Sequence, residues 1–184
     1  MAELTSQERL QPSLLDRLTD HDPGNSSEPL DARVLSRQQL RAAVLRDLSW
    51  LFNANRAEPS RRQGKVQRPA NIERELAMWR EAPHAQRSVL NYGLPSLSGE
   101  SVGKLDLRAL SADIKQSILD FEPRIDPNTL EVDAQIDGTV RSHHNQLKLV
   151  IRGHMWNQPV PLELLLSASV DVETGQAGVR DMRA

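Results

Sequence analysis

The chain has 184 residues, of which 38% are hydrophobic, which is enough for one compact domain with a modest core. It contains no cysteine, which excludes disulfides and thiolate metal sites and suits a reducing compartment. Its first residues lack the basic segment followed by an apolar segment that is typical of a signal peptide. Its longest apolar stretch, residues 162–170, is far shorter than the ~20 residues of a membrane-spanning helix. We therefore expect a soluble, cytoplasmic protein.

The net charge of -2 conceals an uneven distribution along the chain. Residues 1–31 hold 2 basic and 7 acidic side chains, residues 32–92 hold 12 and 5, and residues 93–184 hold 9 and 13. A basic middle between acidic ends fits three interpretations: binding to nucleic acid, binding to an acidic protein partner, or a solvated surface. The charge pattern by itself leaves all three open.

Residues 1–31 are predicted to form a flexible arm with one short helix. Three leucines after Pro12 recur at helical spacing, and residues 22–29 are rich in Pro, Gly, Ser and Asp, as in a linker. The arm has too few apolar side chains for a core of its own, so its leucines need cover from the main domain or from another protein. The leucines are Leu14, Leu15 and Leu18, and only this part of the arm is expected to be well ordered.

Two helices separated by a basic loop are predicted in the next part of the chain. The first covers residues 37–53 behind Ser36, a good N-cap, and its apolar residues recur at 3–4 residue spacing. Residues 56–71 contain basic side chains without an apolar period, which predicts a surface loop. A short helix follows at 72–80, and Gly and Pro then enforce a turn within 88–95.

A second amphipathic helix is predicted at residues 107–121, with Asp106 as its N-cap and Pro123 forcing its end. After this helix the apolar period changes from about 3.6 to 2, which predicts strands joined in an antiparallel meander. The strands cover residues 130–136, 147–152 and 160–170. The expected fold is therefore α+β, with N-terminal helices packed on a small, mainly antiparallel sheet of three or slightly more strands.

The predicted organisation is an arm at 1–31, a single α+β domain at 32–176 with a basic insertion at 56–85, and a C-terminal tail at 177–184. The last predicted strand has a complete apolar face, and a long apolar strand at a sheet edge needs a cover or a pairing chain. The alternative is a hairpin strand packed on the helices. The residues expected to contact a partner here are Val160, Leu162, Leu164 and Leu165.

Four segments share a pattern with one protein family. They are residues 12–18 (PSLLDRL), 45–53 (LRDLSWLFN), 88–95 (SVLNYGLP) and 118–125 (ILDFEPRI), the last of which contains the triplet Glu-Pro-Arg. In this order, spread over roughly residues 10–175, the segments resemble the TssE family of type VI secretion baseplates and its relatives in contractile phage tails. The main departure is the basic stretch 56–85, where the family would have a shorter connector.

The resemblance implies a structural, non-enzymatic baseplate subunit without a cofactor or a metal ion. Its implied partners are the wedge proteins TssF and TssG and the sheath subunits TssB and TssC, whose polymerisation it would start, with TssK as a further contact. The baseplate would dock at the inner membrane complex, and neither nucleic acid nor membrane insertion is implied. A sheet edge at residues 160–170 would serve the sheath by pairing with the next chain.

The triplet Glu122–Pro123–Arg124 is the predicted partner-binding site, together with the leucines of the arm. It lies between a helix and a strand, where Pro123 fixes the exit direction and Arg124 offers a rigid fork of donors. We expect both charges at the surface, so that loss of either prevents assembly but changes stability by less than about 1 kcal/mol. Alternatively, Arg124 folds back onto the carbonyls that end its own helix, and the triplet is structural.

Three other functions have weaker support. The phage relatives have carried a lysozyme label, but a glycosidase needs two carboxylates across a sugar site, one of them with a raised pKa, and only 3% of the residues are aromatic. His143, His144 and His154 have no clear partner to complete a metal site. The basic segment 56–74 would bind phosphates, but it lacks interleaved aromatic side chains.

Overall fold

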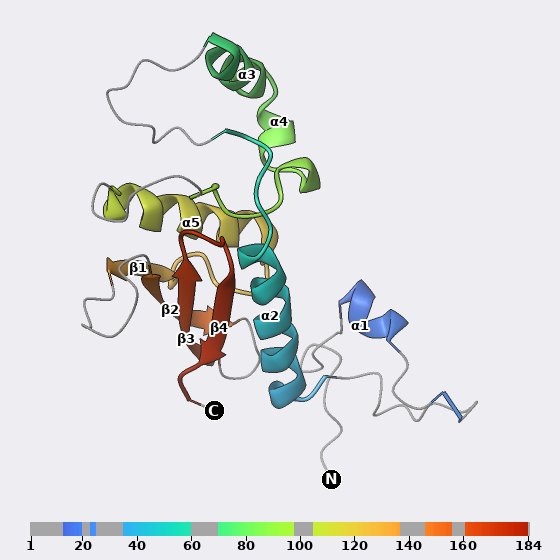
Figure 1. Ribbon diagram of the computed structural model, residues 1–184. Helices are drawn as coiled ribbons and strands as arrows, with labels where there is room; N and C mark the ends of the chain where they lie inside the picture. The colour runs from blue at the N-terminus through green and yellow to red at the C-terminus, as the bar shows by residue number, and fades with distance from the viewer. Residues whose placement is uncertain are drawn as a thin grey trace.

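The computed structural model describes residues 13–19, 23–24, 35–59, 70–97, 105–136, 146–155 and 161–183. Within these residues an antiparallel sheet follows the helices (Figure 1), which confirms the predicted α+β fold. The sheet has the order β1-β2-β3-β4, so each strand pairs with its neighbour in sequence. The strands are β1 (Glu131–Ile136), β2 (Gln146–Met155), β3 (Leu162–Asp171) and β4 (Ala177–Asp181).

The two long helices, α2 (Arg37–Phe52) and α5 (Leu107–Phe121), begin at their predicted N-caps. The Ser36 hydroxyl accepts the Gln39 N–H at 3.2 Å and the Gln39 side chain accepts the Ser36 N–H at 2.8 Å, which closes a capping box. The shorter elements are α1 (Leu14–Leu18), α3 (Ala70–Glu81), α4 (Pro83–Gln86) and the 3-10 turn η2 (Val89–Asn91). The helices predicted at 14–18 and 72–80 are thus present, whereas α4 and η2 are too short to leave an apolar period in the sequence.

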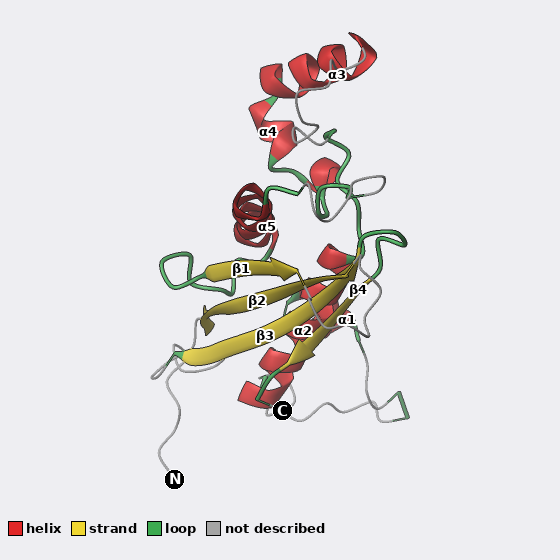
Figure 2. Cartoon of the chain, turned by 60° about the vertical axis from the view of Figure 1, so that its left-hand side comes forward, coloured by secondary structure: helices red, strands yellow, loops and turns green. Residues whose placement is uncertain are grey.

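The core lies between α2, α5 and one face of the sheet (Figure 2). Helix α5 packs along β1, and α2 packs along β4. The period of two in β2 and β3 has the predicted effect, because every second side chain is buried beneath the helices. These buried residues are Leu147, Leu149, Ile151 and Met155 in β2 and Leu164, Leu166, Ala168 and Val170 in β3.

The strand predicted at residues 160–170 is not at a sheet edge. β3 pairs along its length with β2, and Leu166–Val170 also pair with β4, so the expectation of a free edge is wrong for this half of the strand. The register of described pairs gives Leu162–Leu164 no partner in β4. Leu164 is in the core, Leu162 and Leu165 are partly buried, and Val160 lies outside the described residues. The edges of the described sheet are β1 and β4.

Residues 177–181, which the sequence pattern assigned to a tail, form the fourth strand. The Asp171 carboxylate accepts the N–H groups of Glu173 and Thr174, and Gly175 takes the positive φ of 71° that closes the turn before β4. Helix α2 holds both ends of β4. At one end the Asn53 amide donates to the carbonyl of Ala177 at 2.9 Å and accepts its N–H at 3.0 Å, and at the other end Arg41 contacts Asp181 at 3.3 Å.

Helices α3 and α4 project from the end of the molecule that lies beyond α5 (Figures 1 and 2). Residues 60–69, and with them most of the predicted basic loop, lie outside the described residues, as do His143, His144 and residues 25–34 of the arm and its junction. In the described part of the chain no helix has the length and apolar character to cross a membrane. The described residues also contain no cluster of three or more His, Cys, Asp or Glu side chains suited to a metal ion.

Candidate functional site

The predicted triplet forms a sharp corner between α5 and the first strand. Glu122 is the C-cap of α5, and its N–H still donates to the carbonyl of Ile118 at 2.8 Å. Pro123 cannot continue the helix, so the chain turns and the N–H of Ile125 returns to the carbonyl of Glu122 at 3.3 Å. The buried side chain of Ile125 then anchors the corner in the core, and its backbone bridges to Met155 in β2.

The Arg124 side chain folds back onto the Glu122 carboxylate. Its Nε donates to Glu122 Oε1 at 2.7 Å and its Nη2 donates to Oε2, a two-point contact that suits the planar guanidinium. The Glu122 residue is only 3% exposed, so the expectation of a surface charge at this position is wrong. The alternative, in which Arg124 folds back, is closer to the structure, but the acceptors are carboxylates rather than helix carbonyls.

A chain of alternating charges connects this corner with the arm. Arg124 Nη2 also contacts Asp47 in α2, Asp47 accepts from Arg46 Nε at 2.9 Å, and Arg46 Nη1 lies 2.9 Å from Asp16 in α1. The members, in order, are Glu122, Arg124, Asp47, Arg46 and Asp16, and we call them the charge network. Because it joins three helices that are far apart in sequence, the network fixes where α1 lies relative to the corner.

The surroundings of Arg124, Arg46 and Asp16 favour the charged form of each side chain. Burial lowers the pKa of Arg124, but the hydrogen bond and charge of Glu122, followed by those of Asp47, outweigh it and raise the pKa above its ordinary value. Burial raises the pKa of the Asp16 carboxyl, yet the hydrogen bonds of Ser13 and the contact with Arg46 lower the pKa by more. The contacts with Asp47 and Asp16 likewise raise the pKa of Arg46.

An exposed apolar surface lies on the arm side of the charge network. Leu14 and Leu18 of α1 are each 74% exposed, and Leu15 is also exposed. Trp50 of α2 is 52% exposed, and the Arg46 guanidinium lies 5.3 Å from the centre of its ring. Arg46 thus contacts both Asp16 of α1 and Trp50 of α2. The name α1 surface is used below for Leu14, Leu15, Leu18 and Trp50.

The structure brings some of the predicted site residues together and separates others. The triplet and the three leucines of the arm are connected through the charge network. Leu162 pairs with Met155, which also bridges Ile125, so this end of β3 lies near the corner. Asp16, Arg46 and Asp47 were not predicted as site residues, although Arg46 and Asp47 are adjacent charges within the family-like segment 45–53.

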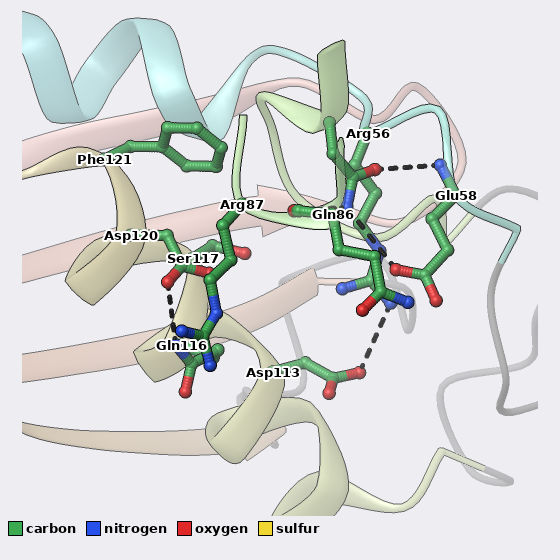
Figure 3. Close-up of a pocket in the computed structure, with 10 residues that line it drawn as sticks. Arg56, Glu58, Gln86, Arg87, Asp113, Gln116, Ser117, Asp120 and Phe121 are labelled. Carbon is green, nitrogen blue, oxygen red and sulfur yellow. Dashed lines mark hydrogen bonds and ion pairs between the residues drawn. The ribbon is translucent and has the colours of Figure 1, made fainter. Parts of the chain in front are cut away.

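A polar pocket of about 200 Å³ lies between α5 and the segment that leads to η2 (Figure 3). Its acidic side chains have donors as neighbours: Asp113 contacts Arg56 at 3.7 Å, and Asp120 accepts from Gln116 at 2.9 Å. A glycosidase acid needs an apolar setting, whereas these carboxylates lie among polar and charged side chains. Its lining residues are Arg56, Glu58, Gln86, Arg87, Asn91, Asp113, Gln116, Ser117, Asp120 and Phe121.

One family model, described as baseplate wedge protein gp25, matches residues 38–160. The chain belongs to the gp25 family. This membership confirms the relation to TssE and phage baseplate wedge proteins, and it assigns the chain a structural role in a phage-tail-like baseplate, in contact with other baseplate components. No curated protein and no solved structure matches the chain significantly.

The gp25 match covers the corner but not the whole charge network. Asp47, Glu122 and Arg124 lie inside the matched range, whereas Asp16 and the α1 surface leucines precede it. The described part of β3 and all of β4 follow it. The gp25-like core of this chain therefore contains the corner, and the arm is attached to it through Arg46.

Replacing Asp16 with asparagine is expected to release α1 without unfolding the domain. The substitution keeps an acceptor for Ser13 but removes the charge that contacts Arg46, and a partly exposed ion pair contributes less than about 1 kcal/mol. Hydrogen exchange of residues 14–18 should become faster while the melting temperature of the domain changes little. Because the pKa of Asp16 is lowered, the same release is expected in the wild type only as the pH falls below its ordinary pKa of 3.8.

The matched control is Glu163→Gln, which breaks the exposed contact of Glu163 with Arg183 at 2.6 Å and leaves α1 alone. Unchanged exchange of residues 14–18 in the Asp16 variant would show that the ion pair does not hold α1.

Proposed function

We propose that the chain is a TssE-type subunit of a type VI secretion baseplate. It binds the wedge proteins TssF and TssG and starts the polymerisation of the contractile sheath built from TssB and TssC. It acts in the cytoplasm, in a baseplate docked at the inner membrane complex, with TssK as a further neighbour. The gp25-family match carries this proposal, because the matched range includes the Glu122–Pro123–Arg124 corner.

The wedge proteins are proposed to bind at the corner and the α1 surface together. Leu14 and Leu18 are each 74% exposed, so a partner that covers them removes apolar surface from water, which contributes favourable free energy to binding. The charge network holds α1 against α2 beforehand, which reduces the entropy lost on binding. At the corner, Pro123 is exposed and Arg124 is partly exposed, so both can still contact a partner, whereas Glu122 acts from the interior by holding Arg124.

The sheath is proposed to begin at the free edge of β4. An extended segment can add to an exposed sheet edge through main-chain hydrogen bonds. Because Leu166–Val170 of β3 are paired on both sides, that role passes to the edge strand β4, which α2 fixes in position at Ala177 and Asp181. The sheet would thereby act as a template for the first sheath subunit.

The test is binding of the purified chain to the co-purified TssF–TssG complex. The double variant Leu14→Asp with Leu18→Asp should bind at least about tenfold more weakly, since it places charges where apolar contacts are expected. Its folding should not change, because both side chains face solvent in the free chain. The control Met78→Asp, on the exposed side of α3, should bind as the wild type does.

Two results would contradict the proposal. The first is a folded wild-type chain that binds neither TssF nor TssG. The second is peptidoglycan cleavage by the purified chain above buffer background, which would replace a structural role with an enzymatic one.

A further inference from the structure

The turn η2 presents two adjacent large apolar side chains to solvent. Val89 is 80% exposed and Leu90 is 69% exposed, at the tip of the segment from Ser88 to Leu94. Single exposed apolar residues are common on protein surfaces, but a pair at a loop tip is unusual because such tips are normally polar. Such exposure can arise in a flexible loop or in a loop whose conformation is fixed by specific contacts.

Hydrogen bonds from within and below the segment hold the tip in one conformation. The Ser88 hydroxyl accepts the Leu90 N–H at 3.3 Å and donates to the carbonyl of Ala85 at 2.9 Å. The buried Asn91 amide accepts the Glu58 N–H at 2.9 Å and donates to the carbonyl of Gln86 at 3.0 Å. These contacts fix the backbone on both sides of the Val89–Leu90 pair.

The far end of the segment is anchored in the domain itself. The Tyr92 ring meets Phe121 of α5 edge-on, with the ring centres 5.1 Å apart. Leu94 is buried, and its N–H donates to the carbonyl of Ala54 at 2.8 Å. Gly93 between them has a φ of 124° and lies against the Ala54 backbone so closely that no side chain fits. The fold therefore constructs a rigid support whose tip is apolar.

The surface beside this tip carries an available positive charge. The polar pocket adjoins the tip, because Gln86, Arg87 and Asn91 line it, and Figure 3 shows the Arg87 side chain reaching into it. Within the described residues Arg87 makes no ion pair or hydrogen bond, whereas the pocket carboxylates Glu58, Asp113 and Asp120 each contact a donor. A partner group that enters here meets a guanidinium that no described residue neutralises, and the charge complementary to it is a carboxylate.

We propose that the Val89–Leu90 tip and Arg87 form a second docking site for another baseplate protein. The occupant is a protein segment that places apolar side chains over Val89 and Leu90 and a carboxylate next to Arg87. The site lies near α4, away from α1 in both views (Figures 1 and 2), so it is separate from the α1 surface. The rigid support reduces the ordering cost of binding, which is the advantage of a preorganised contact. The inference rests on the proposed function, since the partner is taken from the wedge proteins named above.

The test compares the full chain and its variants in binding to the co-purified wedge complex. The double variant Val89→Ser with Leu90→Ser should bind at least about tenfold more weakly, as expected for loss of an apolar anchor. Arg87→Glu should bind more weakly as well, and the loss should shrink at high salt because the contact is electrostatic. Met78→Ser, another exposed apolar residue on α3, is the matched control and should bind normally. Thermal melts of all variants should match the wild type, since none of these side chains is buried.

A photo-crosslinking amino acid placed at Leu90 identifies the occupant. A covalent adduct with a wedge protein is the expected result, whereas a homodimer adduct would assign the tip to a second copy of this chain and overturn the proposal. Wild-type affinity in the double variant would overturn it too. If the wild-type chain fails to bind the wedge complex at all, the proposed function fails with it, and this outcome differs from a wild type that binds and variants that bind equally well.

Discussion

Replacement of Arg124 by alanine is expected to lower the free energy of unfolding of the isolated domain by about 3 kcal/mol. The substitution leaves the carboxylate of Glu122 without its guanidinium, in a residue that is 3% exposed, and removing one member of a buried ion pair typically costs 3–5 kcal/mol. The value is placed at the lower end because the Arg124 side chain is itself 22% exposed. For a chain of this length, the melting temperature should fall by roughly 6–12 °C.

The control for this experiment is Arg108→Ala, in the first turn of α5. The Arg108 side chain is exposed and makes no hydrogen bond or ion pair among the described residues, so its loss should change the melting temperature by no more than about 2 °C. If Arg124→Ala melts with the control, the fold-back contact contributes nothing to stability and the triplet acts only through a partner. If it melts far below the control, a loss of baseplate assembly in this variant must be corrected for its loss of folded protein.

Gly93→Ala should be destabilising to a similar degree, about 3 kcal/mol or more, through a different mechanism. A methyl group at this position would lie 2.4 Å from the carbonyl oxygen of Ala54, a backbone atom that cannot rotate away. The residue also has a φ of 124°, which L side chains rarely adopt, and such strain alone costs about 1–3 kcal/mol. Overpacking against fixed atoms adds about 1–3 kcal/mol. The expected result is a lower melting temperature together with faster hydrogen exchange in residues 88–94.

Gly175→Ala separates the two causes. Gly175 also has a positive φ, 71°, but nothing lies within 4 Å of the position of its added methyl group. Its substitution should therefore lower the free energy of unfolding only through backbone strain at positive φ, by about 1–2 kcal/mol. Equal destabilisation by the two glycine variants would show that the close approach at Ala54 is relieved by a shift of the chain, and the rigid support described for Val89 and Leu90 would lose its main anchor.

The parts of the fold that were predicted correctly are those encoded by local chemistry. Ser36 and Asp106 mark the starts of α2 and α5, Pro123 marks the end of α5, and the change of apolar period marks the sheet. β4 was missed because it is short and has only two apolar side chains, Ala177 and Val179, so its alternation is weak. Its position depends on contacts with α2 and β3, and a local sequence pattern does not predict such long-range contacts.

The burial of the candidate site was missed for a similar reason. The triplet itself was found in the sequence, but its contact with Asp47 joins residues that are 77 positions apart. An Arg two residues after a Glu gives no sign that the backbone turns to bring them together, because that turn depends on Pro123 and on the burial of Ile125. The sequence pattern therefore predicted the corner at the right place in the chain but not the burial of Glu122.

The Asn53 amide gives the edge of β4 a defined starting point. In an antiparallel pair, alternate residues direct their N–H and C=O groups away from the partner strand, and in β4 these residues are Ala177, Val179 and Asp181. Asn53 occupies both groups of Ala177 in the way an added strand would, so the next outward-facing pair, which no described residue occupies, belongs to Val179. A one-residue slip would turn every side chain of an incoming strand to the opposite face. The Asn53 amide at the end of α2 would therefore fix the hydrogen-bond register of any strand that adds to β4. Every copy of the chain would fix the same register.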